Sequence, residues 1–350
     1  MKNKLGKQTF QFPLKPRIIG SCSIVGEKEG KGPMAKWFDI ILEDDTFGEK
    51  TWEKSESKML KQALLLALQR SGLEKDQIDS MLTGDLINQL MPSSFMARDL
   101  SIPFLGIYGA CSTMTESMIL GSMMIDGLYA SNILIGASSH YCTAERQFRM
   151  PLEHGNQRPP SAQWTSTAAG GMVLSANDKG DAAVTQGQDV KEIYITHATP
   201  GKIIDAGIKD VNQMGAAMAP AAVDTIVRHL MDTQRAPEFY DLILTGDLGL
   251  IGKQIAMDLL NGAGMDVANI YDDCGAMMYF ESQDTHGGGS GCGCSASIFS
   301  GYVYKEMRSG KIKNALLVST GALLSTISPQ QGESIPGIAH AVAVTTEGGN

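Results

Sequence analysis

The chain has 350 residues, of which 43% are hydrophobic and 19% are charged, and its formal net charge is −9. This length suits two cores or one large two-lobed core, and the composition argues against global disorder. The acidic charge without a basic block argues against nucleic-acid binding, and no apolar run is long enough to span a membrane. Because the N-terminus lacks the apolar core of a signal peptide, we expect a chain on the cytoplasmic side with six free cysteines.

The first strong pattern along the chain is a helix followed by a buried strand. Apolar residues recur at helical spacing over Ser57–Ser71, and Gly72 is placed to end the helix. The sequence DSMLTGDL then begins at Asp79. An apolar run that ends in glycine is typical of a buried parallel strand leading into a turn.

A cysteine opens the next predicted helix. The apolar stretch Ile102–Tyr108 leads into GACST, in which Cys111 precedes a helical apolar pattern, and a further strand is predicted from Asn132. A cysteine at a helix N-terminus has a lowered pKa, and the free N–H groups there bind anions. Cys111 is therefore a candidate nucleophile or part of an anion pocket, while a buried structural cysteine remains the simpler alternative.

The same order of elements recurs in the second half of the chain. A predicted helix over Ala221–Asp232 is followed by DLILTGDL from Asp241, so the peptide TGDL repeats at a spacing of 162 residues (83 to 245). A cysteine-containing helix start at Gly291 and a strand from Asn314 follow. We interpret this as two homologous α/β halves, residues 1–175 with the loop 141–165 and residues 176–350, each with a mostly parallel sheet. Two unrelated doubly wound domains are the alternative.

Two irregular stretches and one cysteine pair complete the candidates. The segment 27–56 shows little regular pattern, and the loop 141–165 is long enough to be functional. Cys292 and Cys294 lie near His286, but their spacing is not C-x-x-C and no second ligand pair follows. We therefore expect no metal and no cofactor.

Two α/β halves with a cysteine at a strand-to-helix turn of the first resemble the thiolase and ketoacyl-synthase superfamily. That resemblance implies two pseudo-symmetric halves packed as a layered α-β-α-β-α body. Within the superfamily, the sequence is also similar from end to end to a family of sporulation proteins from spore-forming bacilli. The stretches that carry this closer similarity include YGACST (Tyr108–Thr113), GASSH (Gly136–His140), NQRPPSAQWT (Asn156–Thr165), SGCGCSA (Ser290–Ala296) and IPGIAHAV (Ile335–Val342).

The superfamily's condensing members pair the cysteine with a histidine in D-x-x-x-P-H-x-x-N and with an asparagine in G-N-x-S. On Asp241–Gly249 the histidine position falls on Gly246, and in the second motif the asparagine position falls on Cys292. The resemblance therefore implies that Cys111 is a vestigial nucleophile and that the protein is not an enzyme. An active Cys-dependent acyltransferase or condensing enzyme, with His140 or His340 as partner, is the alternative.

The resemblance to the sporulation family implies binding of dipicolinic acid and its movement, as a calcium chelate, into the forespore. It implies a soluble subunit of a membrane channel complex, peripheral at the cytoplasmic side of the spore inner membrane, with membrane-embedded partners from the same operon and a role in germination. Dimers are common in the superfamily, so a homodimer is compatible with it. The candidate ligand-binding residues are Cys111, Ser112, Thr113, Ser139, His140, Arg146, Arg149, Gly246, Cys292 and His340.

Overall fold

The structure is a computed structural model that describes residues 3–148, 158–176 and 190–347. Its main sheet has two arms whose strand orders mirror each other. In the first arm the order from the centre outward is β3 (Arg17–Val25), β9 (Ala168–Ser175), β7 (Asn132–Ser139), β5 (Ser80–Gly84) and β6 (Phe104–Gly106). In the second it is β10 (Tyr194–Thr199), β15 (Gly337–Thr345), β14 (Asn314–Ala322), β11 (Leu242–Thr245) and β12 (Tyr271–Asp273).

Strand directions also match between the arms. In each arm three strands are parallel, β7–β5–β6 and β14–β11–β12, and the strand nearer the centre, β9 or β15, is antiparallel. The arms join where Tyr194 of β10 lies opposite Arg17 of β3. The shorter strands are β1 (Lys4–Leu5), β2 (Thr9–Gln11), β4 (Ile40–Ile41), β8 (Trp164–Thr165) and β13 (Gly289–Ser290).

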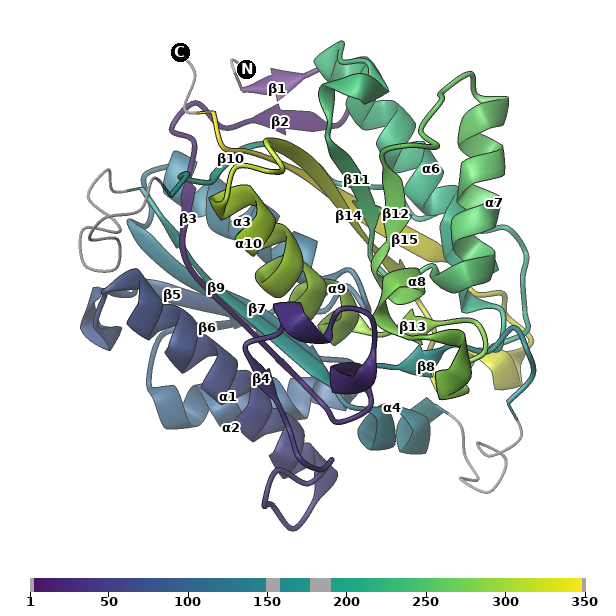
Figure 1. Cartoon of the computed structure of the whole chain (residues 1–350), viewed down its shortest axis with the longest axis horizontal. Helices are drawn as coiled ribbons and strands as arrows, with labels where there is room; N and C mark the ends of the chain where they lie inside the picture. The colour runs from purple at the N-terminus through teal and green to yellow at the C-terminus, as the bar shows by residue number, and fades with distance from the viewer. Residues whose placement is uncertain (1–2, 149–157, 177–189, 348–350) are drawn as a thin grey trace.

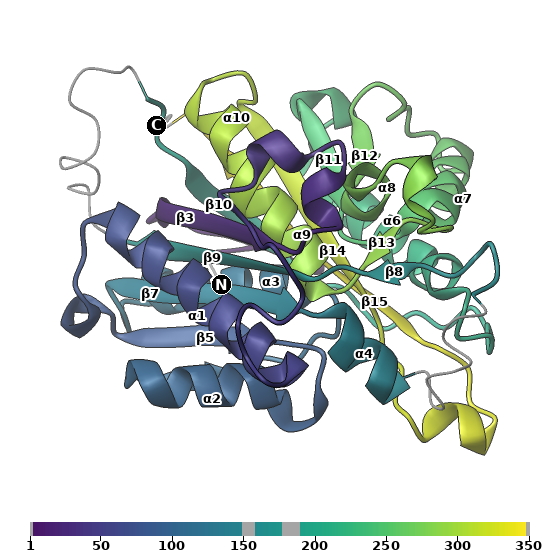
Figure 2. The ribbon, with the colours of Figure 1, turned by 60° about the horizontal axis from the view of Figure 1, so that its bottom comes forward.

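Helices cover both arms and also separate them (Figure 1, Figure 2). The outer helices are α1 (Trp52–Ser71) and α2 (Met91–Leu100) on the first arm, and α6 (Met214–Thr233) and α7 (Gly249–Gly262) on the second. Between the arms lie α3 (Thr113–Asp126) and α9 (Cys292–Ile298), with α10 (Tyr304–Arg308) continuing from α9. Two further short helices are α4 (Tyr141–Phe148) and α8 (Cys274–Met278). This confirms the expected layered α/β body.

The layers explain why the predicted strands read as continuous apolar runs. Every residue of β7 and β9 is buried, because α1 covers one face of this arm and the central helices α3 and α9 cover the other. A strand buried on both faces has no polar alternation. The strands predicted before both TGDL peptides are confirmed as the parallel strands β5 and β11.

Both outer helices that the pattern predicted begin earlier than expected. Helix α1 starts at Trp52, inside the stretch expected to be irregular, because the Thr51 side chain accepts a hydrogen bond from the Lys54 N–H and caps it. Helix α6 starts at Met214 and contains Pro220. Pro220 cannot donate a backbone hydrogen bond, and this destabilises the helix. Burial of the alanine-rich turns around it stabilises the helix by more. Gly72, at φ +71°, ends α1 as predicted.

The repeat is visible in hydrogen bonds at the strand starts. Asp79 Oδ2 accepts from the N–H of Asn132 at 2.9 Å, and Asp241 Oδ2 accepts from the N–H of Asn314 at 2.9 Å. Each bond ties the start of one parallel strand to its neighbour at the same point of the repeat. The division into halves 1–175 and 176–350 stays a prediction. Strand β2, near the start of the chain, pairs with β10 of the second half, so the two halves exchange a strand contact.

Candidate functional site

Cys111 lies in a tight turn between β6 and α3. Ala110, directly before it, has φ +49°, a left-handed conformation that costs a non-glycine residue on the order of 1 kcal/mol. Ser112 Oγ donates to the Gly109 carbonyl at 2.6 Å, and Thr113 Oγ1 donates to the Ala110 carbonyl at 2.7 Å. Both hydroxyls are fully buried and shape the turn. Their role as ligand contacts stays a prediction, and the structure gives them other partners.

The second TGDL peptide lies beside this turn. Gly246 follows β11, and a Cβ at this position would lie 2.8 Å from both Ser319 Cα and Thr320 N of β14. A histidine side chain therefore does not fit here without a shift of the β14 backbone. The next residue, Asp247, is fully buried, and its carboxyl lies close enough to the Cys111 thiol to shift its pKa.

Asp247 is held by other donors as well. Thr320 Oγ1 donates to its Oδ1 at 2.6 Å, while Ser290 Oγ and the Gly291 N–H donate to its Oδ2, both at 3.0 Å. These bonds come from β14, β13 and the start of α9. The carboxyl therefore has a fixed position at the point where the two arms meet.

This carboxyl opposes ionisation of the thiol. Burial raises the pKa of Cys111 well above its usual value, and the Asp247 carboxylate raises it further. The Gly291 N–H lowers the pKa of Cys111, but this effect is smaller than the other two. Burial also raises the pKa of Asp247. Because a nucleophilic cysteine needs a thiolate, usually favoured by a cation or a base, the local charge works against nucleophilic chemistry.

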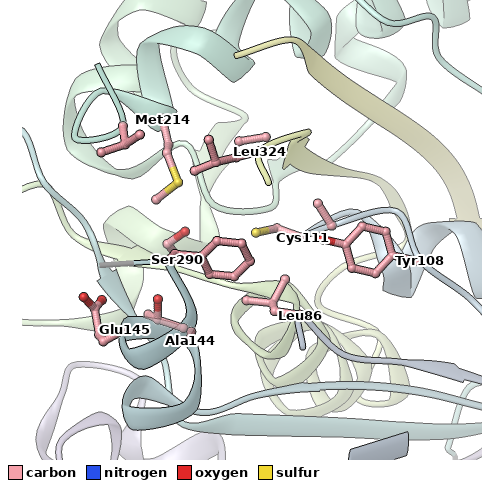
Figure 3. A pocket seen from close by; sticks show the side chains of 13 residues that line it. Leu86, Tyr108, Cys111, Ala144, Glu145, Met214, Ser290 and Leu324 are labelled. Atoms are coloured by element: carbon pink, nitrogen blue, oxygen red, sulfur yellow. The ribbon is translucent and has the colours of Figure 1, made fainter. Parts of the chain in front are cut away.

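Cys111 opens onto a small pocket with mostly apolar walls. The cavity has a volume of about 50 Å³, which is room for a few water-sized groups. Figure 3 shows the Cys111 sulfur directed toward the space between Leu86, Leu324 and Ser290. The other lining residues are Tyr108, Ala110, Ala144, Glu145, Phe148, Thr165, Val211, Met214 and Ala322.

The polar groups of this lining are few. Glu145, on α4, is the charged residue among the described lining side chains. The Thr165 hydroxyl makes no hydrogen bond within the part of the chain that the structure describes, so it is available to a ligand. Tyr108 and Ser290 add two further hydroxyls, of which that of Ser290 already donates to Asp247. The pocket thus combines one carboxyl and three hydroxyls with mostly apolar walls.

Cys292 and Ser139 do not belong to the pocket lining. The Cys292 thiol is fully buried and donates to the Ser138 carbonyl at 2.8 Å, and burial raises its pKa well above the usual value. Ser139 Oγ donates to the Ser166 carbonyl at 2.7 Å and accepts from the Gly293 N–H at 3.1 Å. These groups connect the end of β7 to the start of α9.

The two candidate histidines have other partners. His140 Nδ1 accepts from the Cys142 N–H at 3.1 Å, so its Nε2 donates to the Asp45 carbonyl at 2.8 Å. His340 Nδ1 accepts from the Gly201 N–H at 3.0 Å. Burial lowers the pKa of His140 and lowers that of His340 to about 4, so both rings are neutral. Neither ring lines the Cys111 pocket.

Of the two candidate arginines, Arg146 does not line the pocket. Arg146 forms an ion pair with Glu53, and its guanidinium lies 5.8 Å from the centre of the Trp52 ring. Arg149 lies outside the described residues. The structure therefore brings Cys111, Cys292 and the Gly246 turn together. The binding roles of all these residues stay predictions.

Asp247 and Glu145 are the site residues that sequence reasoning missed. Asp247 follows Gly246 within the repeated tetrapeptide itself, so asking what replaces the missing base would have found it. Glu145 carried no such signal, because α4 was expected to be part of an irregular loop. Its position depends on how α4 packs beside β8.

Within residues 3–148, 158–176 and 190–347, no three His, Cys, Asp or Glu side chains gather as metal ligands. His286 interacts instead with Asp284 and with the Pro159 carbonyl. Among the described helices, none has the length and hydrophobicity needed to cross a membrane.

The chain is similar to one protein family over nearly its whole length. Residues 6–345 match the model of the stage V sporulation protein AD family. The chain is 43% identical over 344 residues to the stage V sporulation protein AD of Bacillus subtilis (strain 168), with 98% of each protein covered.

Solved structures with low sequence identity share the fold. They include 3-oxoacyl-[acyl-carrier-protein] synthase III from Aquifex aeolicus, with a TM-score of 0.55 and 11% identity over 94% of this chain and 99% of that one. A variant of OleA from Xanthomonas campestris has a TM-score of 0.60 and 13% identity over 97% of this chain and all of its own. Human mitochondrial 3-ketoacyl-CoA thiolase has a TM-score of 0.54 and 13% identity over 95% and 98%.

Proposed function

The chain belongs to the stage V sporulation protein AD family, and from that premise we propose that it binds dipicolinic acid in the pocket at Cys111 without catalysing a reaction. Dipicolinic acid is pyridine-2,6-dicarboxylic acid, a small planar ring with two carboxyl groups. The observation that carries the proposal is the contact between the Asp247 carboxyl and the Cys111 thiol.

This contact supports the loss of condensing chemistry. A condensing enzyme needs a thiolate to accept an acyl group, and then donors that stabilise the oxyanion. Here a carboxyl raises the pKa of Cys111, and the backbone of β14 leaves no space for a histidine at Gly246. Cys292, at the position of the asparagine, directs its thiol to a backbone carbonyl.

The lining of the pocket suits a flat ligand whose charge is neutralised, and the side chains around the cavity of about 50 Å³ would have to move apart to admit it. Its walls are mostly apolar, which favours a ring, and Thr165 offers a free hydroxyl. Asp247 lies behind Cys111, so a ligand carboxylate at that end of the pocket would meet a carboxyl group. A calcium chelate of dipicolinate carries no net charge and meets less repulsion there. This supports the chelate as the bound form.

We also propose a wider role, which rests on family membership. The protein would take part in moving the chelate into the forespore during sporulation, and in germination, as a peripheral subunit at the cytoplasmic side of the inner membrane. Membrane-embedded subunits of the same operon would be its partners, and a homodimer is the assembly that the fold suggests.

Calorimetric titration with dipicolinate, with and without equimolar calcium, tests the ligand. We expect saturable binding that calcium strengthens. Met214→Trp fills the pocket and should weaken binding at least about tenfold. Met231→Trp is the matched control, because Met231 lies on the same helix and is 59% exposed. Absence of binding, or equal weakening by both variants, would reject the proposed site.

A second measurement addresses the alternative, an active acyltransferase. The purified protein is incubated with acetyl and malonyl coenzyme A and its intact mass is recorded. We expect no acyl adduct. An adduct on Cys111, together with turnover that Cys111→Ser abolishes, would establish the enzyme instead.

A further inference from the structure

A second, larger cavity lies at the other end of the second arm. Its volume is about 270 Å³, and its lining includes Phe12, His197, Arg235, Phe239, Tyr240 and Asn314. Strand β14 begins here and ends at the Cys111 pocket, so the two cavities are separated by roughly 25 Å of strand. Figure 1 shows β2 and β10 at this end of the molecule.

The repeat shows that this cavity is particular to the second half. The spacing of 162 residues also relates the two outer helices, because Gly72 and Gln234 end α1 and α6 in the same left-handed conformation. At this spacing, Tyr240 corresponds to Ile78 and Arg235 corresponds to Leu73. These two polar residues of the cavity thus have apolar counterparts in the first half.

A pair of histidines replaces a pair of small residues at the same place. His197 of β10 corresponds by strand register to Gly20 of β3, since both follow the irregularity in their pairing with β15 and β9. His229 corresponds to Ala67 at the repeat spacing. A Cβ on Gly20 would lie 2.1 Å from the Ala67 carbonyl oxygen, so the first half is closed here. In the second half the two imidazole rings meet edge to face at 6.4 Å.

A buried chain of hydrogen bonds orients the His229 ring. Thr9 Oγ1 donates to Asp232 Oδ2 at 3.2 Å and is 2.8 Å from Thr199 Oγ1. Because the Thr9 proton is used on the carboxylate, Thr199 donates to Thr9 and accepts from His229 Nδ1, at 2.7 Å. His229 therefore carries its proton on Nδ1.

The same chain continues to the cavity wall. His229 Nε2, without a proton, accepts from the Tyr240 hydroxyl at 2.6 Å. The Tyr240 oxygen in turn accepts from Arg235 Nη1 at 3.0 Å. The Arg235 guanidinium is also 4.1 Å from the centre of the Phe239 ring. Arg235 is thus held at the cavity by one hydrogen bond, and its other N–H groups remain for a ligand.

Asn314 supplies a second recognition group. Its counterpart Asn132 uses its whole amide, since Nδ2 donates to the Gln77 carbonyl at 3.0 Å and Oδ1 accepts from Ser175 Oγ at 2.7 Å. The Asn314 amide lines the cavity and has no hydrogen-bond partner in the described part of the chain. The same residue is structural in one half and open to a ligand in the other.

The Arg235 guanidinium favours an anion in the cavity, because it has no acidic partner among the described residues. Lys15 and Glu347 also line the cavity. Burial and the charge of Arg235 lower the pKa of His197 to about 4, so this ring is neutral at pH 7. Phe12 and Phe239 add flat apolar surface.

We propose that this cavity is a second ligand site, which binds a small carboxylate bearing a flat apolar ring. The guanidinium fork of Arg235 binds the carboxylate, the Asn314 amide donates to it, and the phenylalanine rings contact the body of the ligand. The proposal does not depend on dipicolinate binding at Cys111. A ring with one carboxylate suffices for this site.

The test uses the full chain and three probes. Binding of benzoate, dipicolinate and inorganic phosphate is followed by ligand-observed NMR, and crystals are soaked with 4-bromobenzoate to locate the bromine by its anomalous signal. We expect benzoate to bind and the bromine to lie between Arg235 and Phe12. Phosphate should bind more weakly, because it lacks the ring. Bromine density in the Cys111 pocket alone, or phosphate binding as tight as benzoate, would overturn the proposal.

Variants separate this site from the first. Arg235→Met keeps the side-chain stem and should weaken benzoate binding at least about tenfold. Arg98→Met removes an exposed cation on α2 and should change nothing. Asn314→Asp keeps the shape and places a negative charge against the carboxylate, so it should weaken binding by a similar factor. Cys111→Ser should leave benzoate affinity unchanged. If Arg235→Met and Asn314→Asp, with unfolding transitions like the wild type, bind benzoate as the wild type does, the proposal is wrong.

Discussion

The two TGDL peptides have the same sequence and lie at the ends of equivalent strands, yet their aspartates have different hydrogen-bond partners. Asp85 accepts hydrogen bonds from Ile87 and Ser93, which follow it closely in the chain. Asp247 instead binds groups on β14, on β13 and at Cys111. A short peptide thus determines where a strand ends, while distant residues determine what its carboxyl does.

The same contrast extends to the threonine and glycine of the peptide. Thr245 Oγ1 donates to Asp273 Oδ2 at 2.8 Å, whereas the buried Thr83 hydroxyl has no partner among the described residues. A Cβ on Gly84 would lie 1.9 Å from the Ile107 carbonyl oxygen, while on Gly246 the nearest atoms are 2.8 Å away. Matched substitutions at both copies can therefore measure what each copy contributes.

The largest difference is expected at the glycines. Gly84→Ala forces a methyl group into a backbone carbonyl and should lower the free energy of unfolding by more than about 3 kcal/mol. Gly246→Ala meets less severe overlap and should cost about 1–3 kcal/mol. Urea unfolding of both variants measures the difference. A larger cost at Gly246 would contradict the packing described here.

At the threonines, the second copy should contribute more to the free energy of unfolding than the first. Thr245→Val removes a hydroxyl that donates to a buried carboxyl and should cost about 1–3 kcal/mol. Thr83→Val removes a buried hydroxyl without a partner, so its unfolding free energy should stay within about 0.5 kcal/mol of the wild type or rise. Thermal and urea unfolding test this pair, and an equal cost at both sites would show that Thr83 has a partner in solution.

Neutralising the aspartates should affect Cys111 at one copy alone. Asp247→Asn removes the negative charge beside the thiol, so the pKa of Cys111 falls and more thiolate is present at a given pH. A fall of one unit in the pKa corresponds to about 1.4 kcal/mol and to tenfold more thiolate at a pH below the pKa. We expect alkylation of Cys111 by iodoacetamide at pH 8 to be about tenfold faster, with the rate profile moved to lower pH.

Asp85→Asn is the control for that experiment, and peptide mass spectrometry distinguishes Cys111 from the other cysteines. The charge of Asp85 raises the pKa of Cys292 and is not among the main influences on the pKa of Cys111. Faster labelling of Cys111 in Asp85→Asn, or unchanged labelling in Asp247→Asn, would show that Asp247 does not control the thiol.

The smallest difference is expected at the paired asparagines. Asn132→Ala loses two side-chain hydrogen bonds and should lower the free energy of unfolding by about 1–2 kcal/mol. Asn314→Ala loses none within the described chain and should change it by less than about 0.5 kcal/mol. Urea unfolding without added ligand gives both values. Equal costs would mean that the Asn314 amide is bonded within the protein.

Much of the fold could be predicted because its signals are local. The apolar run ending in TGDL predicted a buried parallel strand twice, and a glycine predicted the end of α1. The helix starts could not be placed, because Thr51 caps α1 from a stretch without periodicity and because packing keeps Pro220 inside α6. Local patterns determine where elements form, and their ends depend on tertiary contacts.

The candidate site was only partly predictable. Cys111 and the missing base at Gly246 follow from aligning short motifs, and the structure brings these positions together. The partners of His140, His340 and Arg146 could not be predicted, because each lies far away in sequence or on another element. Closeness to a motif in the sequence does not determine where a histidine or arginine side chain points.

By itself, the sequence determined the duplication, the layered fold and the glycine at the motif's histidine position, since each depends on residue order and type. The tertiary structure alone decided that Asp247 contacts the thiol and that His197, His229 and Arg235 surround a second cavity. The physical reason is that a side chain's partners come from whichever elements pack against it. In this fold those elements belong to the other arm or are strands far away in the sequence.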